Sequence, residues 1–438
     1  MRGKQIALGA IGLAGGLVAL VLAAWFLWWA VGSWKLWRAQ ADIRAAGLPT
    51  TAAEILPAPV SEADNAAALL IRAQALVKLL DRREGSLRPC PGSGRAETDP
   101  ALFDEARMAE LRTQMAWPET QEMLEALRTA AEKPAARFAR DYTKGSAIDL
   151  VVAAGPLPGS RWLGTAAWLK ARDGDASGAA ADLFACARLA SFSLDDMFLV
   201  TWLVGKSVDV MSATMTGSVL AALPSGTFQQ ADWQPLFDLW AAHAGSARLS
   251  LARALDGERI FFGSPGFEQL GGRGLRPGEG SAWPRLEPDG DEPALPWLIV
   301  PYVLPFNGLV SADHAAYLQL MLNVSERIAA FQPGDPDNDR LAETIPLTAF
   351  LTRLTAPKLD RVFAPLSEYI VQMQLAAVGL ALEEFRARNG AYPESLDELR
   401  LPPGAVTDPF AGQPFRYQPT KTSVLVYSVG KDGIDNGG

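Results

Sequence analysis

The sequence predicts a mainly α-helical protein with an N-terminal transmembrane helix, a helical-bundle domain and a small α+β module at the end of the chain. Three observations support this prediction. An apolar run without charge, from Ile6 to Val31, lies near the start. Alanine, leucine, arginine and glutamate with helical spacing dominate residues 101–141 and 162–223. A long amphipathic helix pattern and two short strand patterns close the chain.

Residues 1–33 are expected to form a transmembrane anchor. The 26 residues from Ile6 to Val31 would extend about 39 Å as a helix, more than the roughly 30 Å hydrocarbon core of a bilayer. Tryptophans, which favour the membrane interface, gather at the far end of this run: Trp25, Trp28, Trp29, Trp34 and Trp37. A cleaved signal peptide is the alternative, but its apolar region spans only about 7 to 15 residues. We therefore expect a retained helix.

The charges of the chain limit its partners. Forty Lys and Arg residues against 49 Asp and Glu give a net charge of -9, which would repel a phosphate backbone, so nucleic acid is not an expected partner. Basic residues flank both ends of the anchor, so the positive-inside rule does not decide its orientation. The two cysteines, Cys90 and Cys186, lie in a Pro/Gly-rich stretch and an apolar helical run, and whether they pair stays open.

Residues 34–365 are expected to form a mostly helical domain. The stretch "WLGTAAWLKARDGDASGAAADLF" reads as a helical hairpin that turns at Gly174 and Asp175, as in one unit of an α-solenoid. No second copy follows at a fixed period, so we predict a bundle, with solenoid-like hairpins as the alternative. Glycine, proline and polar residues predict irregular loops near residues 82–99, 263–296 and 332–340.

The apolar segment Met197 to Leu223 resembles a second membrane span, but Lys206 and Asp209 fall in its middle. Each charge would cost about 2.5 to 3.5 kcal/mol at the centre of a membrane helix. We therefore predict a buried core helix for this segment.

Residues 366–438 are expected to form an α+β module. Its long helix should end at Asn389 and Gly390, because both residues tolerate the left-handed conformation of a C-terminal cap. Ser395 and Glu398 match a capping box for a short helix. Two candidate strands follow, "PFRYQP" and "SVLVYSV".

Three motifs of this module, "NGAYPESLDEL", "DPFAGQPFRY" and "VLVYSVGKDG", occur in an order that resembles the C-terminal domain of the major pseudopilin of type II secretion systems. The matching residues are Asn389, Gly390, Tyr392, Pro393, Asp408, Pro409, Phe410, Gly412, Pro414, Phe415, Tyr417, Tyr427, Ser428, Gly430, Asp432 and Gly433. The chain lacks the G-F-x-x-x-E prepilin pattern at its N-terminus, so pilin-type processing and polymerisation are not expected. The whole architecture is also similar to a group of uncharacterised bacterial membrane-anchored proteins, which implies no activity.

The resemblance implies a calcium site in the loop after the last strand. Asp432, Asp435 and Asn436 would supply oxygen ligands there, and backbone and water would complete the six to eight oxygens that calcium takes. Because these three side chains alone are too few for calcium, a purely structural turn and tail is the favoured interpretation, with calcium as the alternative. No other metal or cofactor is expected.

No catalytic motif surrounds His243 or His314, the two histidines of the chain, and the nucleophile-elbow, zinc-helix and phosphate-loop patterns are missing. We therefore expect a non-enzymatic protein, anchored by a single span in the cytoplasmic (inner) membrane, with most of the chain on the periplasmic or extracytoplasmic side and with protein partners in the envelope. One alternative is an envelope hydrolase with a carboxylate-based site. Another is an accessory component of a secretion or pilus-like assembly.

Overall fold

The computed structural model describes residues 2–83, 85–150, 156–273, 307–331, 345–353, 363–402, 404–420 and 423–437. Helices dominate these residues, which confirms the mainly α-helical prediction. The α-helices are α1 (Arg2–Ala45), α2 (Ala52–Ile55), α3 (Ala67–Arg82), α4 (Glu105–Met115), α5 (Pro118–Ala131), α6 (Pro156–Arg172), α7 (Ala176–Leu194), α8 (Leu199–Ala222), α9 (Gln230–Gly257), α10 (Ser264–Arg273), α12 (Asn307–Ala330) and α14 (Phe363–Asn389). The shorter helical segments are η1 (Glu62–Asp64), η2 (Pro100–Leu102), η3 (Tyr142–Ala147), the π-helical η5 (Glu258–Gly263) and η8 (Leu396–Leu399).

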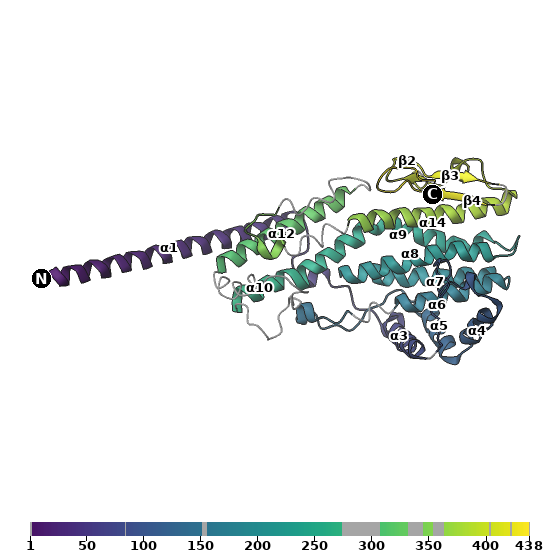
Figure 1. Ribbon diagram of the computed structural model, residues 1–438, viewed down its shortest axis with the longest axis horizontal. Coiled ribbons are helices and arrows are strands. Elements are labelled where there is room, and N and C mark those ends of the chain that lie inside the picture. Colours follow the sequence, from purple (N-terminus) through teal and green to yellow (C-terminus); the bar gives the residue numbers. More distant parts are fainter. Residues whose placement is uncertain are drawn as a thin grey trace.

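Helix α1 projects from the helical body as one continuous helix (Figure 1). Its segment Gly15–Ala45 is long and apolar enough to cross a membrane. Apolar side chains of this segment are exposed, with Leu20 at 70% and Leu27 at 65%, as expected for a helix surrounded by lipid. The helix does not break at residue 33, where the anchor was expected to end. It continues into the body, where Ala39 and Ile43 are buried.

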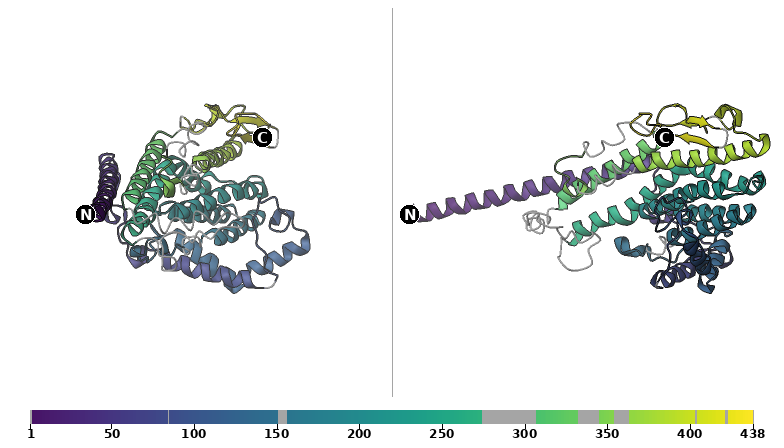
Figure 2. Two further views of the ribbon diagram at one scale, coloured as in Figure 1. Left: turned by 60° about the vertical axis from the view of Figure 1, so that its left-hand side comes forward. Right: turned by 45° about the vertical axis from the view of Figure 1, so that its right-hand side comes forward.

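In the body, α14 packs on α9 and α8, α7 packs on both of these helices, and α6 packs on α7 and α8 (Figures 1 and 2). Helices α6 and α7 form the predicted hairpin. Gly174 adopts a φ of 84° in its turn, which glycine tolerates best, and the Asp175 side chain accepts a hydrogen bond from the Gly178 amide (2.8 Å) at the start of α7. Helix α8 is the predicted core helix, because Trp202 and Asp209 on it are fully buried.

The prediction of an irregular segment at residues 263–296 is wrong for its first part. Residues 264–273 form α10, which continues directly from the π-helical segment η5. Pro265 has no amide hydrogen to donate, yet the helix runs through it directly after the π-helical segment. Turns and extended chain occupy residues 86–99, as predicted. The rest of the second loop and the loop at 332–340 lie outside the described residues.

The C-terminal module follows the predicted order. Gly390 ends α14 with a φ of 79°, and the Glu398 carboxylate accepts a hydrogen bond from the Ser395 amide (3.1 Å) in the predicted capping box of η8. Strands β3 (Arg416–Pro419) and β4 (Val424–Tyr427) pair antiparallel, with Tyr417 opposite Val426. A smaller antiparallel pair joins β1 (Thr407–Asp408) to β2 (Gln413–Pro414).

Two different cores share helix α14. Leu366, Tyr369 and Met373 belong to the core of the body, whereas Val378 and Leu382 pack with Leu396 and Phe415 in the core of the module. The division expected at residue 366 therefore falls inside a helix that contributes to both.

A single carboxylate joins two of the C-terminal motifs. Asp408, in "DPF", is buried and accepts hydrogen bonds from the Phe410 amide (3.0 Å), the Ser428 hydroxyl (2.9 Å) and the Val429 amide (2.9 Å). The last two residues belong to "YSVG". Both motifs are therefore held together by hydrogen bonds to one buried carboxylate.

Candidate functional site

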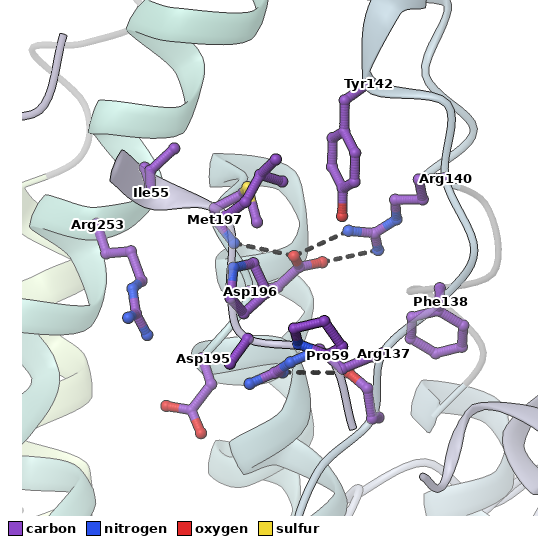
Figure 3. A pocket seen from close by; sticks show the side chains of 14 residues that line it. Ile55, Pro59, Arg137, Phe138, Arg140, Tyr142, Asp195, Asp196, Met197 and Arg253 are labelled. Carbon is purple, nitrogen blue, oxygen red and sulfur yellow. Dashed lines mark hydrogen bonds and ion pairs between the residues drawn. The ribbon is translucent and has the colours of Figure 1, made fainter. Parts of the chain in front are cut away.

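A cavity of about 230 Å³ opens where four segments that are distant in the sequence meet (Figure 3). The chain after α2, residues 56–59, and the loop 136–142 line it. The turn between α7 and α8, residues 195–197, lies between them, and Arg253 reaches the cavity from α9. We call this cavity the loop pocket.

Asn65 positions the loop that forms one wall of the pocket. Its side-chain oxygen accepts a hydrogen bond from the Arg137 amide (2.8 Å), and its side-chain nitrogen donates to the Arg137 carbonyl (2.9 Å). Farther back on this loop, the Arg188 guanidinium of α7 donates to the carbonyls of Lys133 and Pro134. These contacts hold an otherwise irregular segment in one place.

An arginine–aspartate pair joins this loop to the turn. The two terminal nitrogens of Arg140 donate to the two oxygens of Asp196, each at 2.8 Å, in a bidentate ion pair. The Arg140 side chain is only 4% exposed. Burial lowers the pKa of Arg140, but the hydrogen bonds and charge of Asp196 outweigh it and leave this pKa above its usual value. The pair is therefore neutralised within the protein.

The base of the loop pocket is apolar. Ile55 and Met197 line the pocket and also pack with Phe198 and Phe261 in a small separate core. Helix α9 approaches this turn very closely at Gly257, where a Cβ atom would overlap the Met197 carbonyl oxygen. Only glycine fits such a contact, which fixes the turn against the end of α9.

Three other charged side chains line the pocket. Arg137 donates from its Nη1 atom to the Ala136 carbonyl (3.3 Å), and its Nε atom is buried without an acceptor among the described residues. Arg253 and Asp195 are exposed, and neither forms an ion pair with a residue that the structure describes. With the Arg140–Asp196 pair neutral, two arginines and one aspartate remain available to a ligand.

This arrangement suits an anion. Arginine presents planar donors that match a carboxylate or phosphate in two hydrogen bonds. The volume of about 230 Å³ lies below the range of about 300 to 1,000 Å³ that is typical of pockets for drug-sized ligands. The loop pocket thus fits an acidic side chain or a small anion better than a large cofactor.

A second polar cluster lies deep in the body. His243 of α9 contacts Asp209 of α8 through Nδ1 (2.7 Å) and Ser191 of α7 through Nε2 (2.8 Å). The Asp209 carboxylate also accepts hydrogen bonds from the Tyr369 hydroxyl (2.7 Å) and from the Trp240 ring nitrogen (3.2 Å). Burial and the nearby Asp209 charge raise the pKa of Tyr369 well above its usual value.

The order serine, histidine, aspartate matches that of a hydrolytic triad, but the surroundings do not. Ser191 and His243 are 6% and 7% exposed, and Asp209 is fully buried. These side chains do not line the loop pocket. We therefore interpret this cluster as a structural network that joins α7, α8, α9 and α14.

The other candidate residues have internal partners. His314 contacts the Ser264 hydroxyl (3.1 Å) and stacks on Phe267. Asp435 forms an ion pair with Arg416 (3.0 Å) and accepts a hydrogen bond from the Tyr427 hydroxyl (2.8 Å).

Asp432 accepts a hydrogen bond from the Ile434 amide two residues on (3.1 Å), and Asn436 is exposed near the end of the chain. In the part of the chain that the structure describes, no three His, Cys, Asp or Glu side chains gather as a metal site requires. Calcium binding through Asp432, Asp435 and Asn436 stays a prediction.

Both cysteines are free thiols, and burial raises the pKa of Cys186 to about 12.

No protein-family model, curated protein or solved structure matches this chain. The resemblance of the C-terminal module to a pseudopilin therefore stays a prediction as well. Function has to be argued from the loop pocket and from the placement of α1.

Sequence reasoning missed the loop pocket. Its arginines lie in "ARFARDY" and "LARAL", which match no motif, and 56 residues separate Arg140 from Asp196. One local signal was present: two arginines three residues apart, with an aromatic residue between them.

Proposed function

We propose that this protein is a non-enzymatic interaction protein of the cell envelope. In this proposal, α1 crosses the cytoplasmic membrane once and the loop pocket binds an acidic group of a partner protein outside the cytoplasm. The observation that carries the proposal is the pair of arginines, Arg137 and Arg253, which line one small pocket without an acidic partner among the described residues.

The composition of the pocket supports a peptide ligand. Phe138 and Tyr142 offer aromatic surface, and Pro57 and Pro59 stiffen the chain after α2 that also lines the pocket. The small volume admits one side chain or a chain terminus. Asp195, at the edge, would pair with a basic residue or an amine next to the bound carboxylate. An acidic peptide segment meets all of these features.

Binding should depend on both arginines. We expect the double variant R137Q/R253Q to bind its partner much more weakly, by about tenfold or more for each arginine, because each charged hydrogen bond contributes roughly 1.5 to 3 kcal/mol. The measurement is mass spectrometry of proteins captured by the full chain in mild detergent. Fluorescence anisotropy with labelled peptides of the captured partner then tests direct binding.

The matched control is R82Q, which removes an exposed arginine of α3 outside the pocket. It should capture the same partner as the unmodified chain. A partner that is retained equally by R137Q/R253Q and by R82Q would contradict the proposal. So would a peptide whose affinity is unchanged when its acidic residues are replaced by their amides.

The membrane placement has its own test. Protease added to intact spheroplasts should digest the body and leave a short fragment that contains α1. Complete protection of the body would place it in the cytoplasm and contradict this part of the proposal.

A second candidate role is an accessory part of a secretion or pilus-like assembly. The contacts of Asp408 favour it, because they make "DPF" and "YSVG" one structural unit. Co-purification with components of such an assembly should then be lost when Asp408 is replaced by alanine. Loss of the partner in R137Q/R253Q but not in D408A would favour the loop pocket instead.

A further inference from the structure

A second cavity lies along the anchor. A groove of about 690 Å³ runs between α1 and α12, and Pro346, Thr348 and Ala349 also line it. The two helices lie on the side of the body from which α1 projects (Figure 1). Its lining on α1 begins at Ala24 and ends at Asp42, and its lining on α12 begins at Leu309 and ends at Gln319. The groove therefore starts within the apolar segment of α1 and ends beside the body.

The two helices run parallel and touch at a pair of glycines. A Cβ atom on Gly32 would overlap the carbonyl oxygen of Gly308, and one on Gly308 would crowd the carbonyl of Trp28. Beyond this contact, the side of α12 that lines the groove carries small side chains, Ala312 and Ala316 among them. The glycines let the two backbones touch. Beyond this contact the small side chains of α12 do not fill the space between the helices, which leaves the groove.

The chemistry of the groove changes along its length. At the end nearer the start of α1 it is lined by Leu27 and Val31, which are 65% and 45% exposed. Toward the body it is lined by Lys35 and Arg38. Neither of these cations forms an ion pair with a residue that the structure describes, and the Arg38 guanidinium lies 5.9 Å from the centre of the Trp34 ring.

We propose that this groove binds one anionic phospholipid of the membrane that α1 crosses. An acyl chain lies along Leu27 and Val31, and the phosphate pairs with Lys35 and Arg38. Asp42, one turn farther on, repels a phosphate and so limits how far the headgroup reaches toward the body. The site rests on the membrane-anchor part of the proposed function.

The occupant is a lipid rather than a free anion for two reasons. The volume of about 690 Å³ is far larger than a single phosphate needs. The apolar half of the groove is also continuous with exposed apolar surface of α1, which is surrounded by acyl chains once that helix is in a bilayer. Lysine and arginine just beyond a membrane helix attract anionic lipids.

The test compares lipid retention by full-length variants. The chain is reconstituted in nanodiscs of phosphatidylcholine with phosphatidylglycerol, transferred to mild detergent and analysed by native mass spectrometry. The unmodified chain should retain one phosphatidylglycerol. K35Q/R38Q should retain it roughly 25-fold less, about fivefold for each charge removed. R44Q, which removes a cation of the same helix outside the groove, should retain it normally.

A second variant tests whether lipid binding needs the open volume of the groove in addition to its two cations. A312L keeps both cations but fills the groove, and it should also lose the lipid, while circular dichroism shows an unchanged helix content. Equal retention by all variants would overturn the proposal. So would displacement of the lipid by inorganic phosphate at comparable concentration, or a dimer cross-linked through α1 in place of the bound lipid.

Failure of the anchor and failure of the groove give different results. If alkaline carbonate releases the chain from membranes, α1 is not a transmembrane anchor and both ideas fail. If the chain stays in the membrane but retains no phosphatidylglycerol, only the lipid site is wrong.

Discussion

The network around Asp209 and the loop pocket contain the same kinds of side chains, but they differ in how these are paired. Each combines a carboxylate, a side chain with nitrogen donors and aromatic rings. In the network, Asp209 receives three hydrogen bonds and the histidine is bonded at both nitrogens. In the pocket, one arginine is paired with Asp196, while Arg137 and Arg253 have no acidic partner among the described residues.

The paired groups of the network should contribute mainly to stability, whereas the unpaired charges of the pocket should contribute mainly to binding. A buried polar group that has all its hydrogen bonds contributes to one defined structure, and its loss leaves several partners unpaired. A charged group that lacks a partner adds little to folding, but it is available to a ligand. The familiar order serine, histidine, aspartate therefore occurs in the cluster whose groups are all paired, whereas the pocket that matches no motif contains the arginines without an acidic partner among the described residues.

The largest effect should follow from removing Asp209. D209A leaves the His243 ring, the Tyr369 hydroxyl and the Trp240 ring nitrogen buried without their acceptor. We expect it to lower the free energy of unfolding by about 3 to 5 kcal/mol, measured by urea denaturation followed by circular dichroism. D195A, which removes an exposed acid of the pocket, should change it by less than about 0.5 kcal/mol. Similar losses in both variants would remove the distinction between the clusters.

Two buried ionisable groups with few partners should make stability depend on pH in opposite directions. Burial raises the pKa of Glu258 from 4.5 to about 7. Its contribution is therefore complete below pH 4.5 and is lost as the pH rises to 7. Burial lowers the pKa of His314 from 6.5 to about 4. Its contribution is complete above pH 6.5 and is lost as the pH falls to 4.

Between pH 4.5 and 6.5 these two contributions oppose each other. E258Q removes the first, so the stability of this variant should rise with pH in that window by about 1.4 kcal/mol per pH unit, relative to a flatter unmodified chain. Urea denaturation at a series of pH values measures the slope. H314Q should give a slope of the opposite sign, and equal slopes in all three proteins would contradict the assignment.

A smaller and more local effect is expected at Asn65. N65A removes both hydrogen bonds to the Arg137 backbone, which should destabilise the pocket loop by about 1 to 3 kcal/mol. Amide hydrogen exchange at residues 135–140 should become about tenfold faster or more. N389A removes a similar side-chain bond, to the Phe385 carbonyl at the end of α14, and should leave exchange in the pocket loop unchanged.

The smallest change in stability should come from Arg253. Because this side chain is exposed and has no acidic partner among the described residues, R253Q should alter the free energy of unfolding by less than about 0.5 kcal/mol. Its effect should be on partner binding instead. A large loss of stability with unchanged binding would show that the arginine has a structural role.

Local signals predicted much of the fold. The apolar run predicted the long apolar helix α1, Gly174 and Asp175 marked the turn between α6 and α7, and Lys206 with Asp209 identified α8 as a core helix. The Ser395 capping box and the Asn389–Gly390 helix end were also correct. Each of these features depends on residues that are near one another in the sequence.

The site could not be predicted because its residues are far apart in the sequence. The partners of His243 lie 34 and 52 residues away, and Arg140 pairs with an aspartate 56 residues away. No spacing rule connects such residues before the helices are packed. The error at α10 has another cause: the glycines and prolines of residues 263–296 were counted together, although most of them lie after residue 273.

The continuity of α1 has a mechanical consequence. The helix passes from its apolar segment into the body without a break, and α12 packs along it at the Gly32–Gly308 contact. A body on a flexible linker would tumble and search a wide volume above the bilayer. If α1 crosses the membrane as proposed, this continuous helix holds the body at a defined distance from the bilayer, while the protein can still diffuse sideways and rotate about the helix axis. The loop pocket would then stay at a constant height above the lipid, so a partner would have to present its acidic segment at that level.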